Sequence, residues 1–329
     1  MSLTQVLDGF QQRHPAAGFP LAVIYKYVDD QGSYLSALMA YYGFLSLFPL
    51  LLLLTTGLGL LLRDDPELQR RVLQSALTQI PVLGDQLLDD PKSLPGGRAL
   101  VVGVLGSLYG GIGVAQAAQN AMNTVWGVPR NSRPNPLLVR ARSLVLLATV
   151  GLGLLGTTVL SGLGRSAVSD LGVPGLQVAV SVGAVAVNAL VFVFGFRLAT
   201  ARRLARSDVL PGAVGAAAGL QLLQLVGNSY VSRVVKDASD TSGTFAVVLG
   251  LLAYLFLVGV LVVLCAEVNV VRALHLHPRA LLTPFTDAVV LTDADERAYT
   301  RAAQAQRNKG FETVEVTFDP PDRAGEPPA

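Results

Sequence analysis

The sequence predicts an all-α, polytopic membrane protein with a six-helix transmembrane bundle and an extracytoplasmic amphipathic helical loop. Of the 329 residues, 51% are hydrophobic and only 15% are charged, against roughly 25% charged in ordinary soluble domains. Residues 37–62 contain no charge, and this stretch is longer than the roughly 20 apolar residues that cross a hydrocarbon core. Apolar runs of similar length recur along the chain, separated by short connections that carry most of its arginines.

Residues 1–36 are expected to form a cytoplasmic N-terminal and interfacial segment. The first residues lack the basic start and apolar run of a signal peptide. Residues 20–34 are amphipathic and aromatic, which is typical of a segment at the level of the lipid headgroups. A leader packed on the end of the bundle fits the same pattern equally well.

The expected membrane domain, residues 37–272, contains spans at about 37–62, 99–122, 143–164, 173–196, 209–232 and 244–271. Pro49 lies inside the first span, where it removes a backbone hydrogen bond, so it is a candidate hinge. A kink that serves only packing is the commoner role of such a proline. The connection 63–97 contains a helix-start pattern followed by apolar residues on one face, which predicts a surface helix.

Small residues indicate where the spans pack closely. Gly106 and Gly110 in the second span, and Gly215 and Gly219 in the fifth, form GxxxG pairs, a spacing that permits close helix contact. The run GLGLLG at 151–156 matches the GxGxxG pattern. It lies in the middle of a span, without the strand before it and the helix after it that a dinucleotide site needs, so helix packing is the better interpretation.

Polar side chains within the spans form a candidate polar groove. Glu267 is an acid in the sixth span, about one turn from its end, with Arg197, Arg272 or nearby amides as candidate partners. The full candidate set is Glu267, Asn269, Gln116, Gln119, Asn120, Asn188, Gln221, Gln224 and Asn228.

Three of these amides, Gln221, Gln224 and Asn228, follow the spacing i, i+3, i+7, which places them on one helical face and favours a groove. Two alternatives stay open. Such amides equally join helices through interhelical hydrogen bonds worth about 0.6 kcal/mol each. Glu267 equally suits a structural ion pair at the membrane edge.

No catalytic, metal-binding or cofactor-binding group of residues is expected, so the chain is not expected to be an enzyme. His14, His275 and His277 lie outside the spans, and Cys265 is the only cysteine, so neither a zinc pattern nor a disulfide framework is present. Signatures of P-loops, metalloproteases and nucleophile elbows are missing. The net charge of +2 gives no indication of a nucleic-acid partner.

The charge of the connections predicts the topology. Basic clusters follow the second, fourth and sixth spans, whereas the other connections mix acids with bases. The positive-inside rule then places both termini in the cytoplasm. Residues 273–329 are expected to form a cytoplasmic, partly disordered tail with a surface helix within 292–308.

Four stretches resemble the YihY/BrkB family of bacterial inner-membrane proteins, formerly labelled ribonuclease BN. They are AYYGFLSLFPLLLL at 40–53, AAQNAMNTVWGVPR at 117–130, VLPGAVGAA at 209–217 and CAEVNVVRA at 265–273. The resemblance implies a six-helix protein of the bacterial cytoplasmic membrane that supports envelope integrity and moves lipids or other amphiphiles. A non-transporting scaffold is the alternative, and ribonuclease activity is not expected. The expected partners are membrane lipids, with envelope proteins or a homo-oligomer as further candidates.

Overall fold

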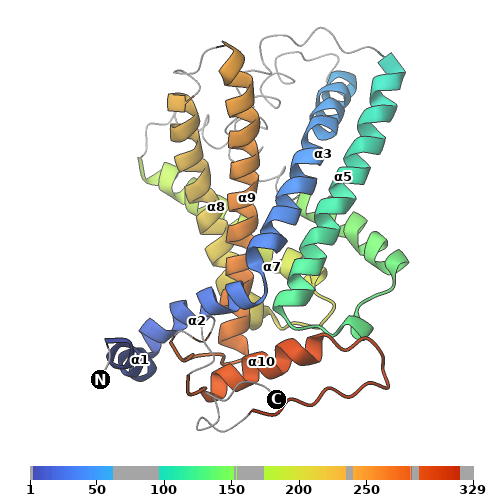
Figure 1. Cartoon of the computed structure of the whole chain (residues 1–329). Helices are drawn as coiled ribbons and strands as arrows, with labels where there is room; N and C mark the ends of the chain where they lie inside the picture. The colour runs from blue at the N-terminus through green and yellow to red at the C-terminus, as the bar shows by residue number, and fades with distance from the viewer. Residues whose placement is uncertain are drawn as a thin grey trace.

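A computed structural model describes residues 3–61, 96–151, 153, 174–234, 240–281, 283 and 289–318. Within these ranges every regular element is a helix and no strand occurs (Figure 1). The prediction of an all-α fold is therefore confirmed for this part of the chain. The surface helix predicted in the connection 63–97 lies outside the described residues.

Long helices occupy the segments predicted as spans. They are α3 (Gly32–Leu61), α5 (Gly96–Val125), α7 (Pro174–Ala199), α8 (Arg206–Val234) and α9 (Asp240–Ala273). Residues 136–151 are also helical, and most of the rest of the third predicted span lies outside the described residues. Packing joins α3 to α5 and α9, and α8 to α7 and α9.

Two of the described helical segments have the length and hydropathy of a membrane span. They are Val182–Ala199 in α7 and Val248–Ala273 in α9. These segments coincide with the fourth and sixth predicted spans. Membrane crossing stays a prediction for all six segments.

Glycines bring the long helices into direct contact. A Cβ atom on Gly110 of α5 would lie 2.6 Å from the Cα of Ser46 in α3, so the two backbones touch there. A Cβ on Gly219 of α8 would lie 2.5 Å from the Leu261 side chain of α9. A Cβ on Gly153, in the run that matches GxGxxG, would lie 2.6 Å from the Val191 side chain of α7. These positions serve helix packing, as the sequence predicted.

Three shorter helices lie at one end of the bundle (Figure 1). They are α1 (Leu3–Arg13), α2 (Pro15–Asp29) and α10 (Asp293–Ala305). Thr292 caps α10, because its side chain accepts the N–H of Asp295 while the Asp295 carboxylate accepts the N–H of Thr292. The surface helix expected within 292–308 is confirmed as α10, which begins at Asp293, directly after the capping residue.

A buried arginine attaches α10 to the N-terminal helices. The side chain of Arg279 is 0% exposed; its Nε donates to Asp295 Oδ1 at 2.5 Å and its Nη1 donates to Asp29 Oδ2 at 2.8 Å. Its guanidinium also lies 5.1 Å from the ring centre of Tyr299. A second link is the N–H of Leu281, which donates to the Asp8 carboxylate. The described part of the tail is thus docked against α1 and α2.

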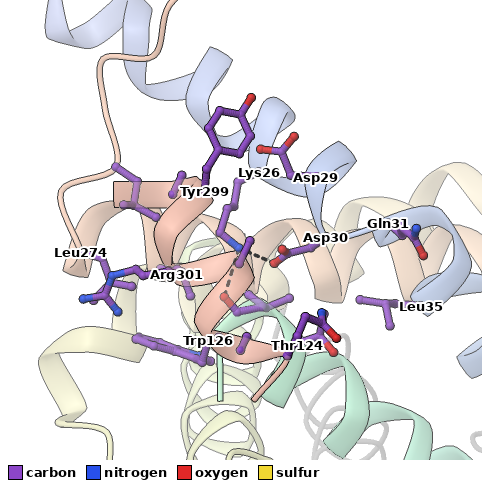
Figure 2. Close-up of a pocket in the computed structure, with 18 of the residues that line it drawn as sticks. Lys26, Asp29, Asp30, Gln31, Leu35, Thr124, Trp126, Leu274, Tyr299 and Arg301 are labelled. Carbon is purple, nitrogen blue, oxygen red and sulfur yellow. Dashed lines mark hydrogen bonds and ion pairs between the residues drawn. The ribbon is translucent and has the colours of Figure 1, made fainter. Parts of the chain in front are cut away.

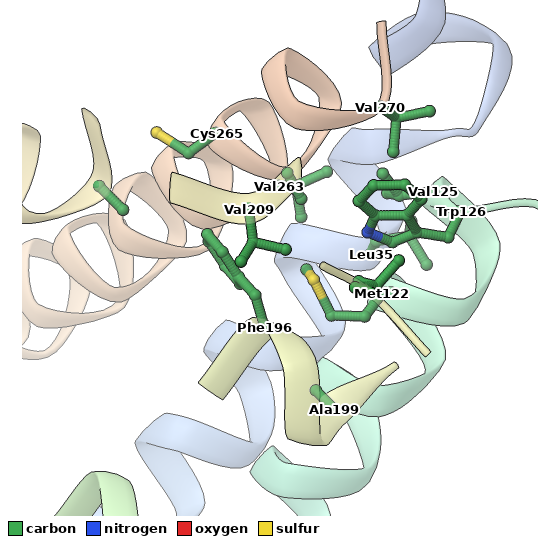
Figure 3. Packing of buried hydrophobic residues seen from close by; sticks show 14 of the residues in the cluster. Leu35, Met122, Val125, Trp126, Phe196, Ala199, Val209, Val263, Cys265 and Val270 are labelled. Atoms are coloured by element: carbon green, nitrogen blue, oxygen red, sulfur yellow. The ribbon is translucent and has the colours of Figure 1, made fainter. Parts of the chain in front are cut away.

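The largest buried cluster lies where α3, α5 and α9 approach α2. Figure 3 shows Leu35, Met122, Trp126 and Val263 packed together. Phe196 of α7 belongs to the same cluster. These side chains are nearly inaccessible to solvent. This cluster therefore joins the ends of the long helices that lie beside α2.

Candidate functional site

A polar cavity of about 460 Å³ lies at the end of the bundle that faces α2 and α10. Figure 2 shows that its wall is built from α2, the end of α5, α9 and α10. The charged side chains that line it are Lys26, Asp29, Asp30, Arg130, Arg133 and Arg301. A mixture of cations with fewer acids thus faces one partly open space.

The end of α5 directs two of these arginines into the cavity. Gly127 has a φ of +59°, which glycine adopts without strain. The N–H of Val128 donates to the carbonyl of Asn123, and the N–H of Gly127 donates to the carbonyl of Thr124. This is a Schellman ending, and it turns the chain from α5 into the short 3-10 helix Arg130–Ser132.

Lys26 is the cation at the centre of the charged cluster. Its Nζ forms an ion pair with Asp30 and donates to the carbonyl of Val125 at 3.3 Å. The same Nζ lies 3.7 Å from Glu267 Oε2. Burial opposes the charge of Lys26, but the carboxylates of Glu267 and Asp30 outweigh burial and raise its pKa above the ordinary value. Burial raises the pKa of Asp30, although the charge of Lys26 acts against this rise.

Glu267 is completely buried, with 0% of its side chain exposed. Its carboxylate oxygens accept no hydrogen bond from the described residues. The partners expected from the sequence are engaged elsewhere, because Arg197 donates to the carbonyl of Leu204 and Arg272 to that of Ser207. The cation that pairs with Glu267 is instead Lys26, which corrects the expectation.

A second cavity, of about 480 Å³, lies inside the bundle and is almost entirely apolar. Residues from α3, α5, α7, α8, α9 and the helical stretch 136–151 all line it. Gln224 and Tyr254 are the polar side chains among its lining residues. All the long helices of the described structure therefore meet around one apolar space.

The two cavities lie one above the other along the same helices, α3, α5 and α9. Leu35 lines the polar cavity and Met39 the apolar cavity, one turn apart on α3. Val125 and Met122 are related in the same way on α5. About one helical turn of buried apolar side chains separates the two spaces, and on α9 Glu267 lies between Val262 and Val270, which line one cavity each.

The predicted groove residues lie in different environments in the structure. Asn269 is buried and its Oδ1 accepts the N–H of Gly212 at 2.7 Å, which joins α9 to α8. Gln119 is buried and donates to the Ser143 hydroxyl at 2.8 Å, which joins α5 to the helix 136–151. These two amides make interhelical hydrogen bonds.

Other predicted residues lie on cavities or recesses. Asn120 lines the polar cavity and Gln224 the apolar one, while Gln116 lines a small recess beside Arg140. Asn188 and Gln221 are half-buried. Pro49 lies within α3 and Asn228 within α8, but their side chains lie outside the described part of the structure.

Lys26 and Asp30 belong to the site, although the sequence did not predict it. Lys26 and Asp30 are spaced i, i+4, a pattern that indicates an ion pair on one helical face. Nothing in the sequence connects this pair to Glu267. No group of three or more His, Cys, Asp or Glu side chains that could hold a metal ion occurs among the residues that the structure describes.

A protein-family model described as virulence factor BrkB matches residues 23–285 of the chain. The ribonuclease-like protein YfkH of Bacillus subtilis (strain 168) is 26% identical over 266 residues, which cover 78% of this chain and 94% of the relative. No solved structure matches the chain. All four stretches of the sequence that carry the resemblance lie inside the matched residues.

Proposed function

Because this chain belongs to the BrkB family of membrane proteins, we propose that it moves a lipid or another amphiphile across the bacterial cytoplasmic membrane and so supports envelope integrity. The proposed topology has six spans and both termini in the cytoplasm. An amphiphile has one polar and one apolar part, so a protein that moves it needs a place for each. The pair of cavities is the observation that carries the proposal.

The dimensions and lining of the cavities suit this role. Both volumes, about 460 and 480 Å³, fall within the roughly 300–1,000 Å³ that is typical of small-molecule sites. The polar cavity offers charged groups to a headgroup, and the apolar cavity offers aliphatic side chains to an acyl chain. Since they lie about one helical turn apart along α3 and α5, one molecule can reach both after a small rearrangement of the side chains between them.

The arrangement of charges supports the topology. Arg130, Arg133, Arg202 and Arg203 lie in connections at the end of the bundle where α1, α2 and α10 also lie (Figure 1). An excess of arginine is characteristic of cytoplasmic connections. The polar cavity would then open towards the cytoplasm, with Glu267 and Lys26 between it and the membrane interior and Pro49 as the candidate hinge.

The test is transport of fluorescent phospholipid in liposomes that contain the purified full chain. Gly151 lines the apolar cavity, and a Cβ added there meets no atom of the described residues within 4 Å, so Gly151→Leu adds a side chain to the cavity without a backbone clash in this part of the structure. Transport should fall at least about tenfold in this variant. Gly250 is also helical and does not line the cavity, and a Cβ added there likewise meets no atom of the described residues within 4 Å. Gly250→Leu is therefore the matched control and should transport normally.

A non-transporting scaffold is the second candidate, favoured by the interhelical hydrogen bonds of Asn269 and Gln119. It predicts no lipid movement by the wild-type protein and no effect of Gly151→Leu on envelope integrity in cells. The name of the Bacillus subtilis relative makes RNA cleavage a third activity to measure in the same preparation. Lipid movement that is equal in Gly151→Leu and Gly250→Leu would count against the proposed path.

A further inference from the structure

We propose that the polar cavity binds the phosphate group of a net-anionic headgroup, with Arg133 and Arg130 as the groups that hold it. This inference rests on the proposed function, because it names the polar part of the transported amphiphile. Three features of the molecule support it: the charge of the cavity, the geometry of Arg133 and the position of Arg130.

The acids that line the cavity are already paired. Asp29 accepts from Arg279 at 2.8 Å, and Asp30 pairs with Lys26. Among the described residues no acid pairs with Arg130, Arg133 or Arg301, all of which line the same cavity. The cavity therefore has uncompensated positive charge, and it has no unpaired carboxylate for the ammonium group of a zwitterionic headgroup.

Arg133 is held in place by two hydrogen bonds at the edge of the cavity. Its Nε donates to the carbonyl of Val128 at 3.3 Å, and its Nη1 donates to Asn120 Oδ1 at 3.0 Å. A guanidinium has five N–H donors, so three remain for a ligand. A guanidinium whose orientation is already fixed binds phosphate oxygens in pairs and loses little conformational freedom when it does so.

Arg130 supplies a second guanidinium close to the first. Burial lowers the pKa of Arg133, and repulsion from the charge of Arg130 lowers it further. A phosphate between the two cations would replace this repulsion with two attractions. Thr124 at the end of α5 and Arg301 on α10 line other parts of the same cavity (Figure 2), and each can donate to an oxyanion.

The experiment uses the fluorescence of Trp126, which is the single tryptophan of the chain and lines the polar cavity. The purified full chain in detergent is titrated with short-chain phosphatidylglycerol, short-chain phosphatidylcholine and inorganic phosphate. We expect phosphatidylglycerol to bind at least about tenfold more tightly than phosphatidylcholine. Arg133→Gln should weaken its binding about tenfold or more, because a hydrogen bond to a charged group is lost.

Two variants control for charge and folding. Arg203→Gln removes an exposed arginine that lines neither cavity, and it should bind like the wild type. Arg133→Lys keeps the charge but not the planar pair of donors, and it should recover only part of the affinity. Arg130→Gln is the second test of the site if Arg133→Gln does not give monodisperse protein.

Equal affinity for the two lipids, or no effect of both Arg133→Gln and Arg130→Gln, overturns the inference. Binding of inorganic phosphate but of neither lipid, with the same dependence on Arg133, supports the anion site and overturns the lipid as its source. If phosphatidylglycerol binds as expected but liposomes show no transport, the site stands and the proposed function fails. If transport occurs and does not depend on headgroup charge or on Arg133, the proposed function stands and this inference fails.

Discussion

Lys26 Nζ lies 3.7 Å from Glu267 Oε2, so an electrostatic contact joins α2 to α9. The two side chains are 10% and 0% exposed. Asp30 completes the group through its ion pair with Lys26. In this environment of low polarity each charge depends on its partners, because removal of one partner leaves another buried charge uncompensated.

Lys26→Met should lower the free energy of unfolding by about 3–5 kcal/mol, the usual effect of breaking a buried ion pair. The measurement is the midpoint of thermal unfolding in detergent. Lys309 is fully exposed, so Lys309→Met is the control and should leave the midpoint unchanged. A Lys26→Met midpoint equal to that of the wild type would show that the ion pair contributes nothing.

The defect of Lys26→Met should also depend on pH. Burial raises the pKa of Asp30 and Lys26 opposes this rise, so the variant raises that pKa further. A carboxyl group whose pKa is higher in the folded state loses stability as the pH rises from its ordinary pKa towards the raised value. The difference in midpoint between the wild type and Lys26→Met should therefore widen as the pH rises above the ordinary pKa of an aspartate.

Gly212→Ala should disrupt the contact between α8 and α9. A Cβ on Gly212 would lie 2.0 Å from the carbonyl oxygen of Cys265 and 2.5 Å from Asn269 Nδ2. The helices must separate, which weakens the hydrogen bond from the Gly212 N–H to Asn269 and costs about 1–3 kcal/mol or more. At Gly215, one turn further along α8, the nearest atom is Cys265 Sγ at 3.5 Å. Gly215→Ala is thus the matched control, and a normal unfolding midpoint for both variants would contradict the close approach.

Arg279→Gln should release α10 from the rest of the molecule. The change leaves the carboxylates of Asp295 and Asp29 without their cation, which costs about 3–5 kcal/mol when the partners are buried. Hydrogen exchange should accelerate in residues 293–305 more than in the long helices. Arg297 is exposed, and among the described residues it donates to the carbonyl of His275, so Arg297→Gln should leave exchange almost unchanged. Equal protection of α10 in both variants would rule out Arg279 as its anchor.

Glu267→Gln tests whether the buried acid takes part in the proposed transport. The amide has nearly the same shape as the carboxylate, and Lys26 keeps Asp30 as a partner. We expect folded protein with the normal unfolding midpoint to within a few degrees, and lipid transport reduced about tenfold or more. A silent substitution would assign Glu267 a structural role and favour the scaffold. Arg203→Gln, at an exposed arginine that lines neither cavity, is the control and should transport normally.

Local patterns in the sequence predicted the helices well. Uninterrupted apolar runs predicted α3 and α9, and the surface helix expected within 292–308 is α10. The GxxxG spacing also predicted correctly that Gly215 and Gly219 face a neighbouring helix. In each case the information lies within about two helical turns of the residue concerned, so it can be read from the sequence.

The site could not be predicted in the same way. The polar cavity combines Lys26, Arg133 and Arg301 from three distant parts of the chain, and no local pattern specifies which helix ends meet. Glu267 was recognised as an unusual acid, but its partner was assigned to arginines near it in sequence. The nearest cation comes instead from α2, because α2 packs against α9. Tertiary packing, rather than residue spacing, decides such pairs.

The residues matched to the family end at 285, whereas α10 begins at Asp293. Ala298, Tyr299 and Arg301 of this helix nevertheless form part of the wall of the polar cavity. Substitutions in α10 can therefore change the size and charge of this cavity while residues 23–285 keep their sequence. Exchange of this one helix thus offers a way to alter the part of the cavity wall that lies outside the family's matched residues.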